Sequence, residues 1–583
     1  MKRKRHPPPG PAPARERGPS GAHPGVIAWR ILSGAAVLLA VVQAVRRIWW
    51  CDDAFISYRY AENLNAGLGL VYNAGERVEG YSNFLWTLWI ALGMRLGVSP
   101  EAWSAAWGIA FYAASVALLA WLGWREARGH GSAWLAVPLA AWLAAAHRDL
   151  SVFATSGLET ALFVFLALLA YGLAIEPGLA GRGAAACGLV AGLAALTRPE
   201  GALFAPVLAG YLAWTRRPRW RAIAAFALAF AMVFLPFLLW RIAYYGDFLP
   251  NTFYAKSAWL PWWSQGWIYL RLYAKQYGVI LAGLPLAAVA LWVRRRSPDD
   301  GRAARLALAA GLGLVYTLYI VRIGGDFMYA RMLLPATPFF LILLERGVLG
   351  LLPSRPRVQL AVAAALVVAL LVTPYPFKGK DGPSGIANEP LFYPADDLAT
   401  QKKQGLTLRR YFEGEPVRVA FSAAQARLVY YARPAVAIEC ATGLTDRWIA
   451  HQPLTRRGRI GHEKPAPVSY LLFKRHVDFT LGYAHADALH LGDYVPWARI
   501  WFDDVPGNLV HWDPSILAEM ARRGARFPDL PHYLDGYGAA IDSIPVAQVR
   551  ADFERFRRFY FDYAGDSLRQ APFVARLEQA GEK

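Results

Sequence analysis

The chain has 583 residues, of which 56% are hydrophobic and 18% are charged, and it contains many long apolar runs. This composition excludes an ordinary soluble protein and indicates a chain that crosses a membrane several times. The net charge of +20 does not require a nucleic-acid partner, because most arginines and lysines lie in short segments between apolar runs, as in cytoplasmic loops.

The first apolar run follows a basic segment. Residues 1–25 are rich in proline, glycine and arginine, which predicts a disordered cytoplasmic tail. The run at 26–45 is span-length and leads into RRIWW rather than a small-residue cleavage site, so we expect an uncleaved first span with a cytoplasmic N-terminus. Further spans are expected near 101–122, 133–147, 158–176, 183–197, 200–214, 222–243, 277–293, 304–321, 332–352 and 358–374.

The connections between these spans form two alternating sets. One set is rich in arginine, and the other carries carboxylates, asparagine and aromatic residues, in HRDLSVFATSGLET, LTRPEG, YYGDFLPNTFYAKS and VRIGGDFMYAR. The positive-inside rule then places the second set on the outer face. The apolar segment 82–97 does not fit the alternation and is re-entrant or interfacial, so the total is about 11 spans, with roughly 13 as the upper limit.

The character of the chain changes near residue 375. Residues 375–583 have mixed charge, many prolines and no span-length run, whereas 26–374 form the membrane-embedded part. PVRVAFSAAQARLVYYA and VSYLLFKRHVDFTLGYA alternate as strands do, with helical segments between. The fold class is therefore a polytopic α-helical membrane protein with a C-terminal, extracytoplasmic α/β domain.

The unusual ionisable residues, which lie in the polar loops, all fall on the predicted outer face. Carboxylates near a membrane are costly and usually mark a site, and arginines suit phosphate recognition. The doublet Asp52–Asp53, directly after the first span, is the candidate catalytic pair. The candidates for substrate binding are Arg46, Arg47, Arg59, Glu79, Asn83, Glu159, Arg198, Glu200, Asp247, Asn251, Lys256, Asp326 and Arg331.

The doublet has a structural alternative, because Asp favours helix N-termini and the following ISYRYAENL is expected to be helical. Two adjacent carboxylates between arginines favour a function, since close carboxylates push their pKa values apart and suit one of them to act as a base. Arg46 and Arg47 could be snorkelling anchors, but they lie on the side that the positive-inside rule disfavours, which favours a phosphate partner.

Other features have a structural interpretation as well as a functional one. Arg198 with Glu200, and Asp326 with Arg331, could equally be ion pairs within loops. The tryptophans near the doublet are typical of an interfacial belt rather than a sugar platform. His451, His462 and Glu463 have no recognised metal spacing and are expected in a surface loop.

The motifs resemble a known group of enzymes. DDAFISYRYAENLNAGLGLVYNAGERVEGYSNFLW, SGLETALF, LTRPEG, YYGDFLPNTFYAK, GGDFMYARMLLP and GLTDRWIAHQPLTRRGRIGHEKPAP are similar to segments of the actinobacterial terminal β-arabinofuranosyltransferases, which are GT-C glycosyltransferases. The resemblance implies a polyprenyl-phosphate sugar donor, with arabinofuranose favoured, and an envelope glycan or lipid acceptor at a bacterial plasma membrane.

Carried over to this chain, the resemblance makes Asp52 the first candidate for the catalytic carboxylate and Asp53 the second. It makes Arg59 and Arg198 candidates for the donor phosphate, and Glu159 and Asp326 candidates for the sugar site. It implies no metal ligands, and a divalent cation between carboxylates and phosphate stays open.

Two other functions stay open. A transporter or flippase of a lipid-linked glycan would need ionisable residues in mid-span and paired repeats, and here the ionisable residues gather at span ends. A non-catalytic subunit of an envelope complex would use the doublet as a cap, so that Asp52→Asn would be silent. The sequence leaves the sugar, the acceptor, the anomeric outcome and the oligomeric state open.

Overall fold

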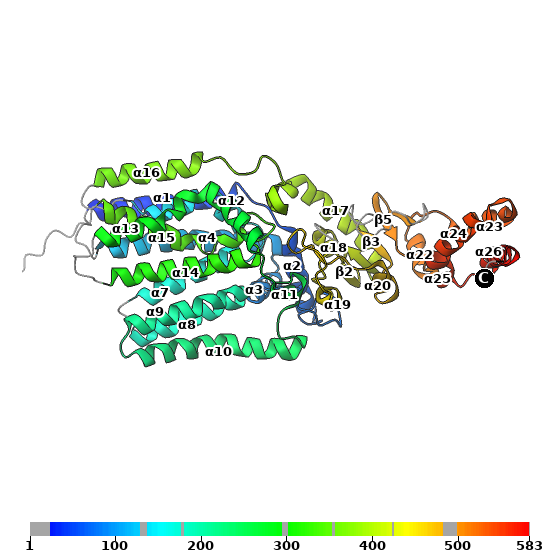
Figure 1. Ribbon diagram of the computed structural model, residues 1–583, viewed down its shortest axis with the longest axis horizontal. Helices are drawn as coiled ribbons and strands as arrows, with labels where there is room; N and C mark the ends of the chain where they lie inside the picture. The colour runs from blue at the N-terminus through cyan, green and yellow to red at the C-terminus, as the bar shows by residue number, and fades with distance from the viewer. Residues whose placement is uncertain are drawn as a thin grey trace, which may run out of the picture.

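A computed structural model of the protein describes residues 24–128, 137–176, 180–293, 301–352, 356–421, 425–481 and 498–581. The predicted N-terminal tail lies almost entirely outside these ranges. A bundle of helices stands at one end of an elongated molecule, a small sheet follows, and a group of C-terminal helices forms the far end (Figure 1). The bundle consists of α1 (Pro24–Val45), α4 (Pro100–Arg128), α5 (Leu139–Ala146), α7 (Thr160–Ile175), α8 (Ala180–Thr197), α9 (Phe204–Thr215), α10 (Arg219–Tyr245), α12 (Trp263–Leu281), α13 (Gly283–Val293), α14 (Arg302–Ile323), α15 (Thr337–Leu351) and α16 (Pro356–Val372).

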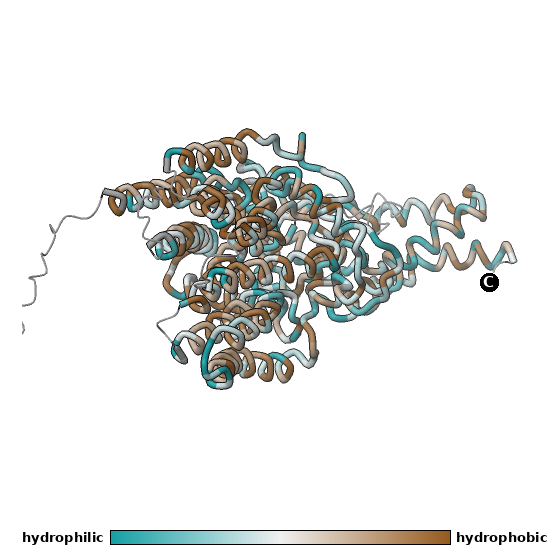
Figure 2. Tube along the Cα trace, turned by 60° about the vertical axis from the view of Figure 1, so that its left-hand side comes forward, coloured by the Kyte–Doolittle hydropathy of each residue, from teal (hydrophilic) through white to brown (hydrophobic). Residues whose placement is uncertain are grey.

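Hydrophobic residues dominate these helices along their length (Figure 2). Within the described residues, five stretches are long and apolar enough to cross a membrane, namely those over α1, α4, α10, α12–α13 and α14. The helices α7, α8 and α16 are apolar but shorter. The expected span at 133–147 is described only from residue 137, and α5 begins at Leu139. The chain is thus a multi-pass membrane protein, and its exact number of spans stays a prediction.

Short elements gather at the end of the bundle that meets the sheet (Figure 1). The segment 82–97 forms α3 (Phe84–Arg95), whose 12 residues cover about 18 Å and fall short of the ~30 Å hydrocarbon layer. This length agrees with an interfacial or re-entrant segment. The other short elements of the membrane part are α2 (Asp52–Asn65), α6 (Arg148–Ala154), η2 (Pro199–Leu203), α11 (Asn251–Ala255) and η3 (Arg331–Leu333).

A five-stranded mixed sheet forms the core of the C-terminal part, as the alternating segments predict. Its order is β2-β1-β3-β5-β4, with β1 parallel to β2 and β3, and β5 antiparallel to β3 and β4. The strands are β1 (Arg418–Phe421), β2 (Val436–Glu439), β3 (Phe479–Leu481), β4 (Arg499–Phe502) and β5 (Val505–Leu509).

The remaining elements surround the sheet or extend beyond it. Those before and between the strands are η4 (Pro383–Gly385), η5 (Glu389–Phe392), α17 (Ala395–Phe412), α18 (Ala426–Ala432), α19 (Arg447–His451) and α20 (Val468–Phe473). Those after the sheet are α22 (Pro514–Arg522), α23 (Leu530–Ala539), η8 (Ile541–Ser543), α24 (Val546–Phe556), η9 (Arg557–Phe561), α25 (Asp562–Ala564) and α26 (Ser567–Gln579).

The sheet domain docks on the first polar loop of the membrane part. Asn73 pairs with the edge strand β2, because its amide donates to the Ala437 carbonyl at 3.0 Å and accepts from the Ala437 N–H at 2.9 Å. Arg59 donates to the carbonyl of Pro434 at 2.9 Å. Buried polar contacts of this kind fix the relative position of the two parts, so that both contribute to one site.

Candidate functional site

The Asp52–Asp53 doublet lies in the first turn of α2. The N-cap residue is Cys51, whose backbone N–H donates to the Ser156 carbonyl at 2.8 Å, and no side chain caps the helix. The two carboxylates therefore do not cap their own helix. Successive residues of a helix point about 100° apart, so the two side chains enter different surroundings.

Asp52 holds the sheet domain. Its carboxylate is buried and accepts hydrogen bonds from the backbone N–H groups of Ala426 and Arg427, at 2.9 and 3.0 Å, where α18 begins. Burial raises the pKa of Asp52 to about 6, although the Arg427 guanidinium opposes the rise. Both carboxylate oxygens are thus engaged in joining α2 to α18.

Among the described residues, no backbone N–H group donates a hydrogen bond of this kind to Asp53. Its side chain is 36% exposed, and its Oδ2 lies 3.8 Å from the Arg331 guanidinium. A carboxylate with a free oxygen at the wall of a cavity can accept a proton or attack an electrophilic carbon. The structure therefore favours Asp53 over Asp52 for chemistry, which reverses the order expected from the sequence.

Two arginines and three carboxylates form a buried network beside Asp53. Glu159 accepts from Arg198 at 2.5 Å and from the Asn83 amide at 2.9 Å, and Arg331 lies 3.9 Å away. Arg198 also pairs with Glu200 at 3.2 Å, and Arg331 with Asp326 at 3.6 Å. These predicted residues, Asn83 included, are brought together as expected.

Backbone geometry places this network. Gly157, in SGLET, has a φ of +80°, and a Cβ there would lie 2.6 Å from the Tyr58 hydroxyl and 2.8 Å from Ala54 Cβ. Only glycine allows the loop before Glu159 to pack this closely against α2. Ala330, next to Arg331, has a φ of +63°, a conformation that costs energy in a non-glycine residue and is frequent at functional sites.

Two cavities meet near Asp53 and Lys256. The larger, of about 280 Å³, lies beside the bundle. The smaller, of about 80 Å³, lies between the bundle and the sheet domain. Lys256 lines both, and in the described part of the chain no carboxylate lies within 4.0 Å of its ammonium group. The larger cavity is lined by Arg198, Glu200, Leu203, Leu249, Phe253, Lys256, Tyr319, Ile323, Asp326, Arg331, Met332 and neighbouring residues.

The sheet domain contributes residues that sequence reasoning missed. The smaller cavity contains Glu389 and Arg459, whose side chains pair at 3.5 Å, as well as Glu439 and His462. Burial raises the pKa of Glu389 to about 7, the Arg459 guanidinium opposes the rise, and the negative charge of Asp53 adds to it. His462, expected in a surface loop, lies in a loop and is half-buried, and it lines the same cavity as Asp53.

An open groove of about 460 Å³ lies at the junction of the two parts. It is lined by Glu76, Val78, Asp446, Arg447, Trp448, His451, Tyr470 and Arg475. The Trp448 ring is 43% exposed and stacks on Tyr470, with centroids 4.1 Å apart. The Tyr470 hydroxyl donates to Asp446 at 3.0 Å, so the aromatic surface is held rigidly.

Three predicted cations do not reach the cavities. Arg46 is exposed, and Arg47 donates to the carbonyl of Gln43 at 3.2 Å, within its own helical end. Arg59 donates to the Tyr72 and Pro434 carbonyls at 2.8 and 2.9 Å. The assignment of these arginines to phosphate binding is therefore corrected, because the first two lie away from both cavities and the third joins the two parts.

Three further predicted residues have structural contacts instead. Glu79 pairs with Arg241 at 2.6 Å, and both are buried. Asp247 pairs with Arg447 at 2.9 Å. Asn251 donates to the carbonyls of Gly443 and Leu444, at 2.8 and 2.9 Å. Their assignment to the substrate is likewise corrected, since each joins loops rather than facing a cavity.

One group among the described residues has ligand atoms close enough together to hold a metal ion. It comprises Asp478, His511 and Asp513, in the sheet domain. None of the three lines either cavity. A divalent cation between Asp53 and a bound phosphate, left open by the sequence, therefore stays a proposal.

Sequence comparison gives two curated relatives. Over 354 residues the chain is 32% identical to the terminal beta-(1->2)-arabinofuranosyltransferase of Mycobacterium tuberculosis, covering 56% of this chain and 56% of that relative. The protein of the same name from Corynebacterium glutamicum is 31% identical over 369 residues, covering 58% and 53%. The resemblance inferred from the motifs is confirmed. The chain spans about half the length of these relatives, and no protein-family model matches it.

Solved structures place the fold. ArnT from Cupriavidus metallidurans bound to undecaprenyl phosphate matches with a TM-score of 0.50 and 15% identity, over 78% of this chain and 96% of that chain. The archaeal oligosaccharyltransferase AglB from Archaeoglobus fulgidus, in complex with an inhibitory peptide and a dolichol-phosphate, matches with a TM-score of 0.51 and 12% identity, over 80% and 71%. The fold is GT-C-like. In this GT-C-like chain, α2 stands where the bundle meets the sheet domain (Figure 1), and the doublet forms part of its first turn.

Proposed function

We propose that the protein is a membrane glycosyltransferase that moves a sugar, with arabinofuranose favoured, from a polyprenyl-phosphate donor to an envelope glycan or lipid acceptor. The observation that carries this proposal is the position of Asp53. Its carboxylate lines the smaller cavity together with Lys256 and lies 3.8 Å from Arg331, which lines the larger cavity.

The larger cavity suits the donor. Leu203, Leu249, Phe253 and Ile323 give it apolar walls for the first part of a lipid, and cations stand at its polar side. Arg198 is already paired with two carboxylates, whereas Lys256 has no ion pair in the described chain. Lys256 is therefore our main candidate for the donor phosphate. The undecaprenyl phosphate and the dolichol-phosphate in the two matched structures support this class of donor.

The reaction needs one carboxylate near the anomeric carbon. The acceptor hydroxyl oxygen bonds to that carbon, the bond from the carbon to the phosphate oxygen breaks, and the polyprenyl phosphate leaves with the electron pair. Asp53 either takes the hydroxyl proton in a single displacement, which inverts the configuration, or first forms a glycosyl ester, which leads to retention. The anomeric configuration of the product, read by NMR, distinguishes these two routes.

The charge around Asp53 favours a cation that accompanies the donor. Four carboxylates, Asp53, Glu159, Glu200 and Asp326, stand against Arg198, Arg331 and Lys256. An added phosphate makes this excess of negative charge larger, and a divalent cation shared by phosphate and Asp53 would reduce it. We therefore include a divalent cation in the proposal, to be tested by chelation and add-back of magnesium, manganese or calcium.

The sheet domain suits the acceptor. The stacked Trp448 and Tyr470 rings form a flat, half-exposed surface, and Glu76, Asp446 and Arg475 offer hydrogen-bonding groups around it. A sugar ring can place its C–H face on such a surface and its hydroxyls on the polar rim. Loop residues 442–446 connect this groove to the cavity that Asp53 lines. Thr442 and Leu444 line that cavity, and Asp446 lines the groove.

The orientation follows from the arginine-rich loops. They alternate along the sequence with the polar loops that carry the doublet and the buried network, and the positive-inside rule places them in the cytoplasm. We therefore propose a bacterial plasma-membrane location, with the N-terminus in the cytoplasm and the sheet domain on the extracytoplasmic face. Cysteine labelling with a membrane-impermeant maleimide at residue 248, compared with residue 217, tests this orientation.

The decisive experiment is a transfer assay with purified protein in nanodiscs. It supplies polyprenyl-phosphate arabinofuranose and a synthetic arabinan acceptor to wild type, Asp53→Asn and the matched control Asp396→Asn, which changes an exposed carboxyl of α17. We expect roughly 100-fold or greater loss for Asp53→Asn at unchanged thermal stability, and near wild-type transfer for the control.

Other outcomes point elsewhere. Full activity of Asp53→Asn would refute the site. Wild type without transfer from any lipid-linked sugar, but with movement of the lipid-linked glycan across the bilayer, would indicate a flippase. Neither activity would indicate a non-catalytic subunit.

A further inference from the structure

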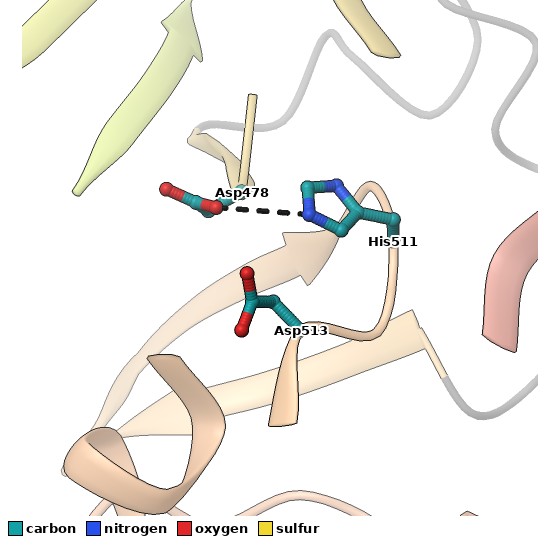
Figure 3. A group of neighbouring side chains, drawn as sticks. All are labelled: Asp478, His511 and Asp513. Atoms are coloured by element: carbon teal, nitrogen blue, oxygen red, sulfur yellow. Dashed lines mark ion pairs between the residues drawn. The ribbon is translucent and has the colours of Figure 1, made fainter. Parts of the chain in front are cut away.

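Three side chains of the sheet domain converge away from both cavities. Asp478 immediately precedes β3, and His511 follows β5. Because β3 and β5 are antiparallel, with Phe479 opposite Leu509, these two positions reach the same end of the sheet. Asp513 begins α22 directly afterwards. Figure 3 shows the three side chains facing one another, and their ligand atoms lie within 4.8 Å of one another.

Each carboxylate is held by one oxygen and keeps the other free for a ligand. Asp478 Oδ2 accepts from the Arg418 N–H at 2.8 Å. Asp513 Oδ1 accepts from the backbone N–H groups of Ser515 and Ile516, at 2.9 and 3.2 Å, and from the Ser515 hydroxyl at 2.6 Å. Supporting hydrogen bonds of this kind orient the ligands of metal sites.

His511 is a second, independent indication. It is only 4% exposed, and in the described part of the chain its Nδ1 has no hydrogen-bond partner. Its Nε2 lies 3.8 Å from Asp478 Oδ1, which is too long for a hydrogen bond. Its ring stacks on Tyr563, with centroids 4.3 Å apart, so its orientation is fixed. A bound ion would pair with Nε2, the ring nitrogen that faces Asp478 (Figure 3).

We propose that Asp478, His511 and Asp513 bind a transition-metal ion, of which Zn²⁺ fits the ligands best. One imidazole nitrogen and two carboxylate oxygens match zinc, whereas magnesium and calcium prefer oxygen ligands alone. The ion joins β3 to the turn between β5 and α22 and stabilises the sheet domain, far from the chemistry proposed at Asp53.

The test uses the full-length, tag-free protein in detergent, treated with EDTA, dialysed and then titrated with ZnCl₂. We expect uptake of one zinc per chain by inductively coupled plasma mass spectrometry, and a rise in Tm of about 3 °C or more. His511→Gln and Asp513→Asn should lose both effects. His532→Ala is the matched control, because His532 is an exposed histidine of the same domain, and it should keep them.

Two results would overturn the proposal. One is absence of zinc uptake by the wild type at micromolar ZnCl₂. The other is equal uptake by Asp513→Asn, a variant that keeps one oxygen for capping α22 and serves if His511→Gln does not fold. A Tm that rises with MgCl₂ but not with ZnCl₂ would contradict the choice of a transition metal.

Discussion

The backbone N–H of Arg427 donates a 3.0 Å hydrogen bond to Oδ1 of Asp52, which precedes it by 375 positions in the chain. Its neighbour Asp53 instead places a free carboxylate 3.8 Å from Arg331. The two residues of the doublet thus have different roles. Asp52 joins the helical bundle to the sheet domain, and Asp53 faces the space where the two parts meet.

Asp52→Asn is expected to lower the stability of the protein rather than its rate of transfer. An asparagine offers one acceptor oxygen where the carboxylate offers two, so one buried N–H at the start of α18 loses its partner. The expected loss is about 1–3 kcal/mol in the free energy of unfolding, and transfer per folded molecule should stay within a few-fold of wild type. Scanning fluorimetry and the transfer assay, run together, measure both quantities. Abolished transfer at an unchanged Tm would return the catalytic role to Asp52.

The face of α2 argues against the order that the resemblance implies for the doublet. Residues seven apart in a helix share a face, so Asp52 and Arg59 point the same way, toward Arg427 and Pro434. That spacing was visible in the sequence. The residues that pack against this face could not be predicted from the sequence, because the contact joins segments more than 370 residues apart.

The network of Glu159, Arg198 and Arg331 was predictable because each residue lies at the end of an expected span, in a loop assigned to the outer face. Arg59 and Glu79 also lie in an outer-face loop and yet make structural contacts, since a loop position does not specify the direction of a side chain. Glu389, Arg459 and His462 were missed for a different reason. They belong to the domain after residue 375, and only its docking on α2 brings them to Asp53.

Lys256→Met is expected to weaken donor binding. The ammonium group lines both cavities without an ion pair in the described chain, so it is available to a phosphate. Loss of a charge-assisted hydrogen bond should raise the donor KM roughly 10- to 100-fold, with the acceptor KM unchanged. Lys403→Met, on the exposed side of α17, is the control. Equal donor KM values for wild type and Lys256→Met would remove Lys256 from the donor site.

Glu389 should give donor binding a pH dependence near neutrality. The pKa of this buried carboxyl is raised to about 7. It is therefore neutral at pH 6 and negatively charged at pH 8, beside Asp53 and a phosphate-bearing donor. The donor KM should rise as the pH increases through 7, because the new negative charge repels the phosphate.

Glu389→Gln stays neutral throughout this range. Its donor KM should be flat between pH 6 and 8, close to the wild-type value at pH 6. Glu413→Gln changes an exposed carboxyl on the same domain and should keep the wild-type profile. The same rise in Glu389→Gln would assign the titration to another group.

Trp448→Ala should weaken the binding of long acceptors only. Trp448 is 43% exposed and rests on Tyr470, whose hydroxyl is fixed by Asp446. Removing the ring deletes a stacking surface worth about 1 kcal/mol, so the KM for an oligosaccharide acceptor should rise roughly fivefold. The donor KM and the KM for a monosaccharide acceptor should not change. Trp501→Ala removes a ring of similar exposure, 40%, from β4 and controls for general loss of aromatic surface. If both variants raise the oligosaccharide KM equally, the groove does not hold the acceptor, and the remote sugars bind elsewhere on the sheet domain.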